Sequence, residues 1–157
     1  MPLAIRPYRS GDAPQVGAIF CRAILEIGAK DYTPDQVEAL AGPPGAAERL
    51  RARLSNGRLA LVAIDDIGHL LAFGDLEADG HIDFLYAAPE AAGTGVASML
   101  YDALEAAARE RATPRLYSEA SEAARRFFLK KGFTVLHRRD FAVRCVAIHN
   151  YAMEKIL

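Results

Sequence analysis

The amino-acid sequence predicts a domain of the mixed α/β (α+β) class. Segments with the two-residue period of strands alternate with segments that repeat apolar residues every three or four positions, as helices do. Three consecutive strand-like segments are joined by loops too short for a crossover helix, so their pairing is expected to be antiparallel. With 157 residues, the chain has the length of one ordinary domain. We therefore expect a single domain over residues 1–157.

The first 54 residues are expected to form one strand and three helices. The apolar stripe of the first helix ends at Gly28, a typical helix-stopping residue. Thr33 is expected to cap the second helix, with Pro34 at its tolerated first position. The predicted segments are a strand over Leu3–Tyr8 and helices over Ala13–Ile27, from Pro34 to before Gly42, and about Ala46–Leu54.

The rest of the chain returns to strand periodicity, interrupted by two helices. Pro114 ends the first of these helices, and Ser121 is expected to cap the second, which Gly132 closes. The predicted strands are Leu59–Ile64, Leu70–Phe73, His81–Ala87, Arg115–Ser118, Phe133–Val143 and Ala147–Ile156, and the helices run from Val96 to before Pro114 and from Ser121 to Lys131.

Composition and charge argue against several classes of partner. Lysine and arginine number 19 against 20 for aspartate and glutamate, so the formal charge of −1 gives no general attraction to nucleic acid or anionic lipid. The chain start, Met1–Arg6, lacks a signal-peptide run, and no later segment is long enough to span a bilayer. Cys21 and Cys145 lack metal-ligand spacing and are interpreted as small core residues. We expect a cytoplasmic protein with no metal, no nucleic acid and no membrane among its partners.

A glycine turn between a strand and a helix predicts an anion site. The third strand of the antiparallel set leads into Pro89-Glu90-Ala91-Ala92-Gly93-Thr94-Gly95, after which a long helix begins. Gly93 and Gly95 let the backbone approach a ligand closely, and the first amides of the helix have no partner within the helix. The helix dipole favours an anion at the same place. This arrangement can bind a pyrophosphate, although the amides alone do not distinguish coenzyme A from other phosphorylated ligands.

The order of elements, the glycine turn and a second motif resemble the GCN5-related N-acetyltransferase family. The second motif is Ser121–Phe133, which ends in Lys131-Gly132-Phe133. The tail from Asn150 to Lys155 is similar to that of a bacterial subgroup of the family. The resemblance covers nearly the whole chain and implies the strand and helix order β-α-α-β-β-β-α-β-α-β-β. It also implies a mixed sheet that splays between its fourth and fifth strands, with the acyl-CoA in the opening.

The resemblance implies acetyl-CoA as the donor substrate and also implies the residues that bind it. The family holds the pyrophosphate mainly through backbone amides of its glycine loop and lays the rest of the donor along the fourth strand and the last helix. The corresponding positions here are Leu85, Tyr86, Ala87, Ala92, Gly93, Thr94, Gly95, Val96, Ala97, Ser121 and Phe128.

Two positions depart from the family pattern. Glu90 replaces the usual glutamine or arginine and brings a carboxylate close to the predicted pyrophosphate. Phe128 stands where many members carry the tyrosine that protonates the leaving thiolate. Because phenylalanine cannot donate a proton, another hydroxyl or solvent must serve the thiolate, whose pKa lies near the 8.5 of a free thiol.

Transfer of an acetyl group to an amine requires a base, because an amine of pKa about 10.4 is protonated at neutral pH. Asp83 is our candidate base, since it interrupts an apolar strand next to the expected cleft. His81 and Glu77 are alternatives. The backbone amide of Leu85 or Tyr86 is expected to stabilise the oxyanion.

Two tyrosines are candidate catalytic residues besides the base. The hydroxyl of Tyr86 can reach the cleft, and Tyr117 on the fifth strand can replace the acid missing at position 128. For each of these side chains an ordinary packing role is the alternative.

The sequence suggests an amine acceptor, of a small molecule or a peptide, without identifying it. The segment Tyr32–Gln36 covers the acceptor pocket in the family, and Arg138, Arg139 or Arg144 can bind a carboxylate on the acceptor. The main hypothesis is direct attack in a ternary complex. The alternatives are an acyl-CoA-binding sensor or regulatory module without chemistry, and a protein that binds another phosphorylated ligand. A homodimer is a further possibility.

Overall fold

The computed structural model describes residues 3–157. Met1 and Pro2, which begin the segment expected to lack a signal peptide, lie outside this part. The strands are β1 (Ala4–Pro7), β2 (Leu59–Ile64), β3 (Leu70–Leu76), β4 (Leu85–Ala87), β5 (Arg115–Ala120), β6 (Thr134–Val143) and β7 (Val146–Ile156). The α-helices are α1 (Ala13–Arg22), α2 (Pro34–Ala41), α3 (Ala46–Leu54), α4 (Val96–Glu110) and α5 (Glu122–Lys130).

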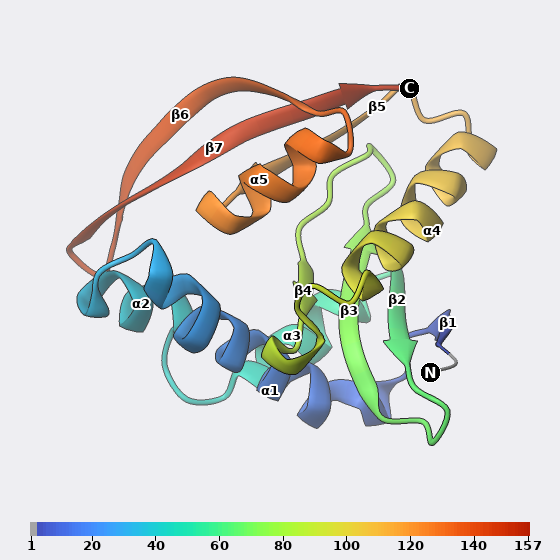
Figure 1. The fold of residues 1–157 in the computed structure, drawn as a ribbon, viewed down its shortest axis with the longest axis horizontal. Coiled ribbons are helices and arrows are strands. Elements are labelled where there is room, and N and C mark those ends of the chain that lie inside the picture. Colours follow the sequence, from blue (N-terminus) through green and yellow to red (C-terminus); the bar gives the residue numbers. More distant parts are fainter. Residues whose placement is uncertain (1–2) are drawn as a thin grey trace.

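The strands form two antiparallel sheets that meet at one point. The first sheet has the order β1-β2-β3-β4, and the second has the order β5-β7-β6. His81, before β4, forms a parallel bridge with Tyr117 of β5. Beyond this bridge the two sheets diverge, as Figure 1 shows for β4 and β5. The predicted mixed α/β class and the splay between the fourth and fifth strands are confirmed.

The apolar core has one part in each half of the molecule. The larger cluster joins the first sheet to α1, α3 and the start of α4, with Val62, Phe73 and Leu100 at most 1% exposed. A second cluster joins α4 to α5 and β5–β7 through Tyr101, Phe128 and other buried side chains. In the view of Figure 1, α4 crosses in front of the first sheet and α3 lies behind it. Helix α4 therefore belongs to both cores.

The predicted helix starts are confirmed in detail. The Thr33 hydroxyl accepts a hydrogen bond from the Gln36 amide at 3.2 Å, and the Gln36 side-chain oxygen accepts one from the Thr33 amide at 2.9 Å. Pro34 occupies the first turn of α2. Ser121 caps α5 by accepting the Ala124 amide at 3.2 Å. These side chains satisfy amides that have no partner within their own helices.

The first predicted helix, Ala13–Ile27, changes type along its length. It is α-helical to Arg22, forms a π-helix over Ala23–Ile27 and continues as a 3₁₀ turn over Gly28–Lys30. The helical conformation therefore continues through Gly28 instead of ending there. A π turn is wider than an α turn and is common near functional sites. Ile24 and Ile27 line a cavity beside β4.

The predicted strand His81–Ala87 is regular only over Leu85–Ala87. The reason is the carboxylate of Asp75, whose Oδ1 accepts the amides of both Asp83 and Phe84 at 2.9 and 2.7 Å. A side chain thus replaces the main-chain acceptor that a regular ladder would supply, and two residues of one strand face one residue of the other. This is the pattern of a β-bulge.

Cys145 is exposed, and the expectation that it is a core residue is wrong. It forms the tip of the β6–β7 hairpin together with Arg144, and both have positive φ values, 67° and 48°. Two consecutive positive φ values make the tight turn that suits the twist of a hairpin. Cys21 is partly exposed. Among the described residues, no helix has the length and the apolar character needed to cross a membrane.

Candidate functional site

The glycine loop presents backbone amides in front of α4. Gly93 and Gly95 have φ values of 77° and 86°, and a Cβ at either position would meet no atom within 4 Å. The amides of Ala92 and Thr94 donate within the loop, to Pro89 at 3.1 Å and Ala91 at 3.2 Å. Within residues 3–157, the amides at 93, 95, 96 and 97 have no backbone partner. Four of the six expected amides are therefore available to an anion, and two are engaged.

Glu90 does not face the loop with an uncompensated charge. Both of its carboxylate oxygens accept hydrogen bonds from the Arg22 guanidinium of α1, at 2.6 and 3.2 Å. This bidentate pair lowers the pKa of Glu90 below its ordinary value. Because the carboxylate is paired with a cation outside the loop, its presence next to an anion site is electrostatically compensated.

Strand β4 has one edge in the first sheet and one edge in the opening. The amide of Asp75 donates to the Phe84 carbonyl at 3.1 Å, and the amide of Ala88 donates to Leu71 at 2.8 Å. Main-chain groups alternate along a strand, so those of Tyr86 also face β3. Those of Leu85 and Ala87 face the opening. Of the two expected oxyanion donors, the geometry leaves the Leu85 amide free and places the Tyr86 amide in the ladder.

Two cavities meet beside this open edge. The first, of about 200 Å³, is largely apolar and extends from the π-helix past β4 to Ala97 and Phe127. The second, of about 130 Å³, contains the carboxylates of Asp83 and Glu119. The residues that line both cavities are Tyr32, Leu85, Tyr86, Ser121 and Ala124. Three sequence-predicted donor-binding residues, Leu85, Tyr86 and Ser121, thus lie at the junction of an apolar space and an acidic one.

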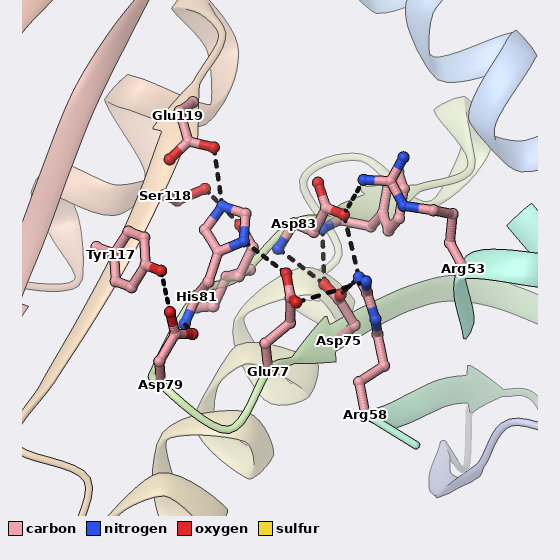
Figure 2. Close-up of polar contacts among 12 residues, drawn as sticks. Arg53, Arg58, Asp75, Glu77, Asp79, His81, Asp83, Tyr117, Ser118 and Glu119 are labelled. Carbon is pink, nitrogen blue, oxygen red and sulfur yellow. Dashed lines mark hydrogen bonds and ion pairs between the residues drawn. The ribbon is translucent and has the colours of Figure 1, made fainter. Parts of the chain in front are cut away.

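Asp83 reaches the acidic cavity while two arginines hold one of its oxygens. Its Oδ2 accepts Arg53 of α3 at 2.5 Å and Arg58, the residue before β2, at 3.0 Å. Figure 2 shows that its other oxygen points away from both guanidinium groups. Within the described chain, Oδ1 has no hydrogen-bond partner, so it can accept a proton from a ligand.

Arg58 is the centre of an acidic cluster. The carboxylates of Asp75, Glu77 and Asp83 lie within 4.8 Å of one another. Arg58 Nη1 lies 2.5 Å from Asp75 and 3.0 Å from Asp83, and its Nη2 lies 3.6 Å from Glu77. The guanidinium supplies the positive charge that these three carboxylates share, as Figure 2 shows.

His81 is held between two carboxylates. Its Nδ1 lies 2.7 Å from Glu77, and its Nε2 lies 2.8 Å from Glu119 of β5. The hydrogen bond to Glu119 raises the pKa of His81 to about 9 against the opposing effect of burial. At neutral pH the ring is protonated and donates from both nitrogens. It therefore cannot accept a proton, and the same contacts occupy Glu77.

The two candidate tyrosines are in different positions. Tyr86 lines both cavities, its ring lies 5.1 Å from that of Phe20, and its hydroxyl has no hydrogen-bond partner within the described chain. Burial raises the pKa of Tyr86 to about 12, so the hydroxyl stays protonated at neutral pH. Tyr117 lines neither cavity: its ring stacks on His81, and its hydroxyl donates to Asp79. That bond raises the pKa of Tyr117 to about 12.

Phe128 lies at the wall of the acidic cavity and is 2% exposed. Its ring packs 4.6 Å from that of Phe133 and 6.2 Å from that of Tyr101. The hydroxyl of Tyr101 points instead to Glu105, at 2.7 Å. Neither ring brings a proton donor to the position that tyrosine occupies in many members of the resembled family.

Tyr32 closes the site from the side of the helices. Its hydroxyl accepts the Glu122 amide of α5 at 3.1 Å and donates to the His149 carbonyl of β7 at 3.1 Å. Beside it, Asp31 forms an ion pair with Arg126 of α5 at 2.7 Å. The segment expected to cover the acceptor pocket therefore contacts the wall of both cavities. Arg138 and Arg139 bind Asp140 and Asn150 instead of pointing into either cavity.

Sequence reasoning missed three residues of the site. Glu119 lines the acidic cavity, because β5 runs two residues further than predicted, to Ala120. Asp75 and Arg58 hold the bulge of β4. An acidic residue within the apolar run Leu70–Leu76 was the available signal for Asp75. Arg58 follows a glycine in a polar loop, and nothing in the surrounding sequence indicated a role in the site.

Comparison with known proteins gives a consistent result. The model of the acetyltransferase (GNAT) domain matches residues 28–155. An uncharacterised N-acetyltransferase of Escherichia coli, YafP, is 28% identical over 151 residues, which is 96% of this chain and 94% of that protein. Two solved structures superpose over the whole chain. A GCN5-related N-acetyltransferase from Rhodopseudomonas palustris has a TM-score of 0.91 and 36% identity, with 97% of its chain covered.

The second structure is the PaiA N-acetyltransferase of Thermoplasma acidophilum in complex with coenzyme A. Its TM-score is 0.80 at 19% identity, and both chains are covered completely. At this identity the likeness concerns the fold. The family model, which spans most of the sequence, and the relative with 36% identity show membership of the family as well. The chain belongs to the GNAT family of acetyltransferases.

Proposed function

We propose that the protein transfers an acetyl group from acetyl-CoA to a primary amine of a small molecule or peptide by direct attack in a ternary complex. The observation that carries the proposal is the junction of two cavities at the open edge of β4. The free amides of the glycine loop lie at one end of this edge, and a carboxylate with an unpaired oxygen lies at the other. The coenzyme A in the Thermoplasma structure of the same fold supports acetyl-CoA as the donor.

The donor is expected to bind through the loop and the open strand edge. Amides at positions 93, 95, 96 and 97 would hold the pyrophosphate. The Leu85 carbonyl and the main-chain groups of Ala87 would pair with the amide groups of the donor's extended arm, as another strand would, and the Leu85 amide would remain for the oxyanion. The acetyl group would then lie where the two cavities meet, with Ser121 and Phe128 in the wall around it.

The amine would enter from the acidic cavity. Asp83 Oδ1 removes a proton from the ammonium form, directly or through a water, and the neutral nitrogen attacks the thioester carbonyl. The Leu85 amide donates to the oxyanion of the tetrahedral intermediate. The carbon–sulfur bond then breaks and releases the thiolate of coenzyme A, while the second amine proton is lost to water, because Asp83 already carries the first. Glu119 is the other carboxylate in reach of the acceptor.

Tyr86 is the proposed proton donor to the departing thiolate. Tyr86 lines both cavities, and its hydroxyl stays protonated at neutral pH and is not engaged by another group of the described chain. Tyr117 does not fit this role, since its hydroxyl is bound to Asp79 outside the cavities. Replacement of Tyr86 by phenylalanine should lower the turnover number about 10-fold.

Two measurements test the proposal. Calorimetric titration should give acetyl-CoA binding with a dissociation constant on the order of micromolar, far tighter than ATP, and Gly95→Asp should weaken it about 100-fold. Release of coenzyme A with a panel of amines should then identify an acceptor. Asp83→Asn should lower kcat/KM about 100-fold, whereas Asp66→Asn, in the exposed β2–β3 turn, should not change it.

The outcomes separate the alternatives. Tight acetyl-CoA binding with no turnover across a broad panel of amines would identify a binding module without chemistry. Equal affinity for ATP and acetyl-CoA would identify a general anion site. Unchanged affinity in Gly95→Asp would show that the donor does not bind at the loop.

A further inference from the structure

We propose that Asp75 and Arg58 are positioning residues for acetyl transfer, which fix the bulge of β4 so that the Leu85 amide and the Asp83 carboxylate face one point. This inference rests on the proposed function of the same site. Neither residue is among those that line the two cavities of the site, and neither would touch the substrates.

The first step of the argument is the position of Asp75 in the sheet. Its own amide donates to the Phe84 carbonyl at 3.1 Å, as expected for paired strands. Its side-chain Oδ1, however, takes the place of the main-chain acceptor and receives the amides of Asp83 and Phe84. The residue before this bulge, Ile82, donates to Tyr117 of β5 at 2.9 Å. Asp75 therefore holds the segment of chain that leaves the second sheet at Ile82 and joins the first sheet at Phe84.

The second step is the connection to the reacting groups. The bulge ends at Phe84, and the next amide along the chain is that of Leu85, the proposed oxyanion donor. The bulge begins at Asp83, the proposed base. One oxygen atom of Asp75 thus holds the amide of the proposed base and that of Phe84, the residue before the proposed oxyanion donor. A displacement of about 1 Å in such a donor or base can lower a rate about 100-fold.

The third step is the second oxygen of Asp75. Its Oδ2 binds Arg58 Nη1 at 2.5 Å, and the same nitrogen lies 3.0 Å from Asp83 Oδ2. The Nε of Arg58 donates to Asn56 at 3.0 Å, so the side chain is fixed at both ends. The side chain of Arg58 is 5% exposed, and that of Asp75 is fully buried. Because one guanidinium joins the bulge to the base, their relative position is set by a single group.

The fourth step is that stability alone does not favour this arrangement. Burial raises the pKa of Asp75 to about 6 although Arg58 and two amides stabilise its charge. The charged carboxylate is therefore less favourable in the folded protein than in water. Buried ion pairs of this kind can often be replaced by apolar residues without loss of stability. Precise placement of the reacting groups is a reason for the protein to retain a buried ion pair at this position.

Asp75→Asn and Arg58→Lys test the proposal, with kcat, KM and acetyl-CoA affinity as readouts. Asparagine keeps an oxygen for the two amides but turns an NH₂ group toward Arg58. Lysine keeps the positive charge of Arg58 but lacks the two nitrogens with which the guanidinium binds several carboxylates. Each variant should lower kcat about 10- to 100-fold and leave the dissociation constant of acetyl-CoA within about 2-fold. Arg58→Met should lower kcat more than Arg58→Lys.

Asp102→Asn is the matched control. It removes an exposed carboxylate in the middle of α4, which pairs with Lys131, and should not change kcat. Amide hydrogen exchange gives a second readout: the Asp83 and Phe84 amides should exchange faster in Asp75→Asn, with unchanged protection in β5–β7.

The results distinguish failure of this inference from failure of the proposed function. Full kcat in Asp75→Asn and Arg58→Met, in an enzyme that Asp83→Asn inactivates, would overturn the positioning role alone. A parallel rise in KM and in the dissociation constant of acetyl-CoA, at unchanged kcat, would also overturn it. A wild-type protein that transfers no acetyl group would instead remove the proposed function on which the inference rests.

Discussion

Two carboxylates in this protein form ion pairs of opposite energetic character. Asp75, at the point where the sheets diverge, is fully buried, and its pKa is raised to about 6 by that burial. Glu105, on α4, is 19% exposed. Burial opposes its charge too, but hydrogen bonds from Lys155, Tyr101 and Arg109 outweigh it and lower the pKa of Glu105 to about 2.

The difference between the two carboxylates indicates what each ion pair does for the protein. Lys155 of β7 contacts Glu105 at 2.7 Å and the Lys131 carbonyl at 2.8 Å, so it ties α4 and the end of α5 to the second sheet. This pair favours folding. Burial of the Asp75 charge opposes folding, and the hydrogen bond from Arg58 offsets that cost only in part. The pair fixes a strand beside the proposed reacting point. The first pair should therefore affect stability without activity, and the second activity more than stability.

Lys155→Met should give the largest loss of stability. It leaves Glu105 without its main cation in a partly buried place, which is expected to cost about 2 kcal/mol. For a chain of this length the Tm should fall by about 6 °C. Arg109→Ala is the matched control, because it removes a more exposed partner of the same carboxylate and should change the Tm little. A loss of kcat with unchanged Tm in Lys155→Met would reverse the comparison.

The pH dependence of stability should differ in sign for the two carboxylates. The raised pKa of Asp75 gives a contribution that is fully present below pH 3.8 and is lost as pH rises through 6. The lowered pKa of Glu105 gives a contribution that is present above pH 4.5 and is lost as pH falls through 2.

Urea unfolding of the wild type and two variants at pH 4.5 and 7 measures this difference. Relative to Asp75→Asn, the wild type should lose about 2 kcal/mol between these pH values. Relative to Glu105→Gln, it should lose none. Equal differences at both pH values for Asp75→Asn would show that Asp75 does not titrate as a buried carboxylate.

His81 extends the comparison of pKa and stability to a cationic side chain. Its pKa, raised to about 9 chiefly by Glu119, gives stability that is fully present below pH 6.5 and is lost as pH rises through 9. Allowing for solvent screening, the contribution is about 1 kcal/mol. Between pH 7 and 9.5, the Tm of the wild type should therefore fall about 3 °C more than that of His81→Gln. Parallel melting curves for the two proteins would contradict this assignment.

The pair of Arg22 and Glu90 should give the smallest effect, and only on the donor. Both side chains are about half exposed, so Arg22→Ala should leave the Tm unchanged. The unpaired carboxylate at position 90 would then repel the pyrophosphate and weaken acetyl-CoA binding about 3-fold. The double variant with Glu90→Gln should restore the affinity. An unchanged affinity in Arg22→Ala would show that Glu90 lies too far from the donor to matter.

Local signals in the sequence predicted most of the fold. The caps at Thr33 and Ser121 depend on residues within one helical turn, and the hairpins follow from short polar loops between apolar runs. The glycine turn was predicted for the same reason, and Gly93 and Gly95 have the positive φ values of such a turn. The family resemblance supplied the splay, which no local pattern shows.

The sequence could not predict the contacts that depend on the register between distant strands. Asp75 meets the amides of Asp83 and Phe84 only because β3 and β4 pair as they do, and the bulge exists only because a side chain enters that pairing. Glu119 reaches His81 across the junction of the two sheets, 38 positions along the chain. The change from α to π geometry at Ala23 likewise has no signal in its neighbours.

The junction of the two sheets also defines a place where the chain can be divided. The loop between α4 and β5, near Ala112, separates the strand edge and glycine loop from α5 and the second sheet. The two pieces would meet through the bridge between His81 and Tyr117, the apolar cluster that joins Leu104 to Met153, and the hydrogen bonds of Tyr32 with α5 and β7. Cleaved or separately expressed halves should therefore reassemble by complementation, and recovered acetyl transfer on mixing would report their association.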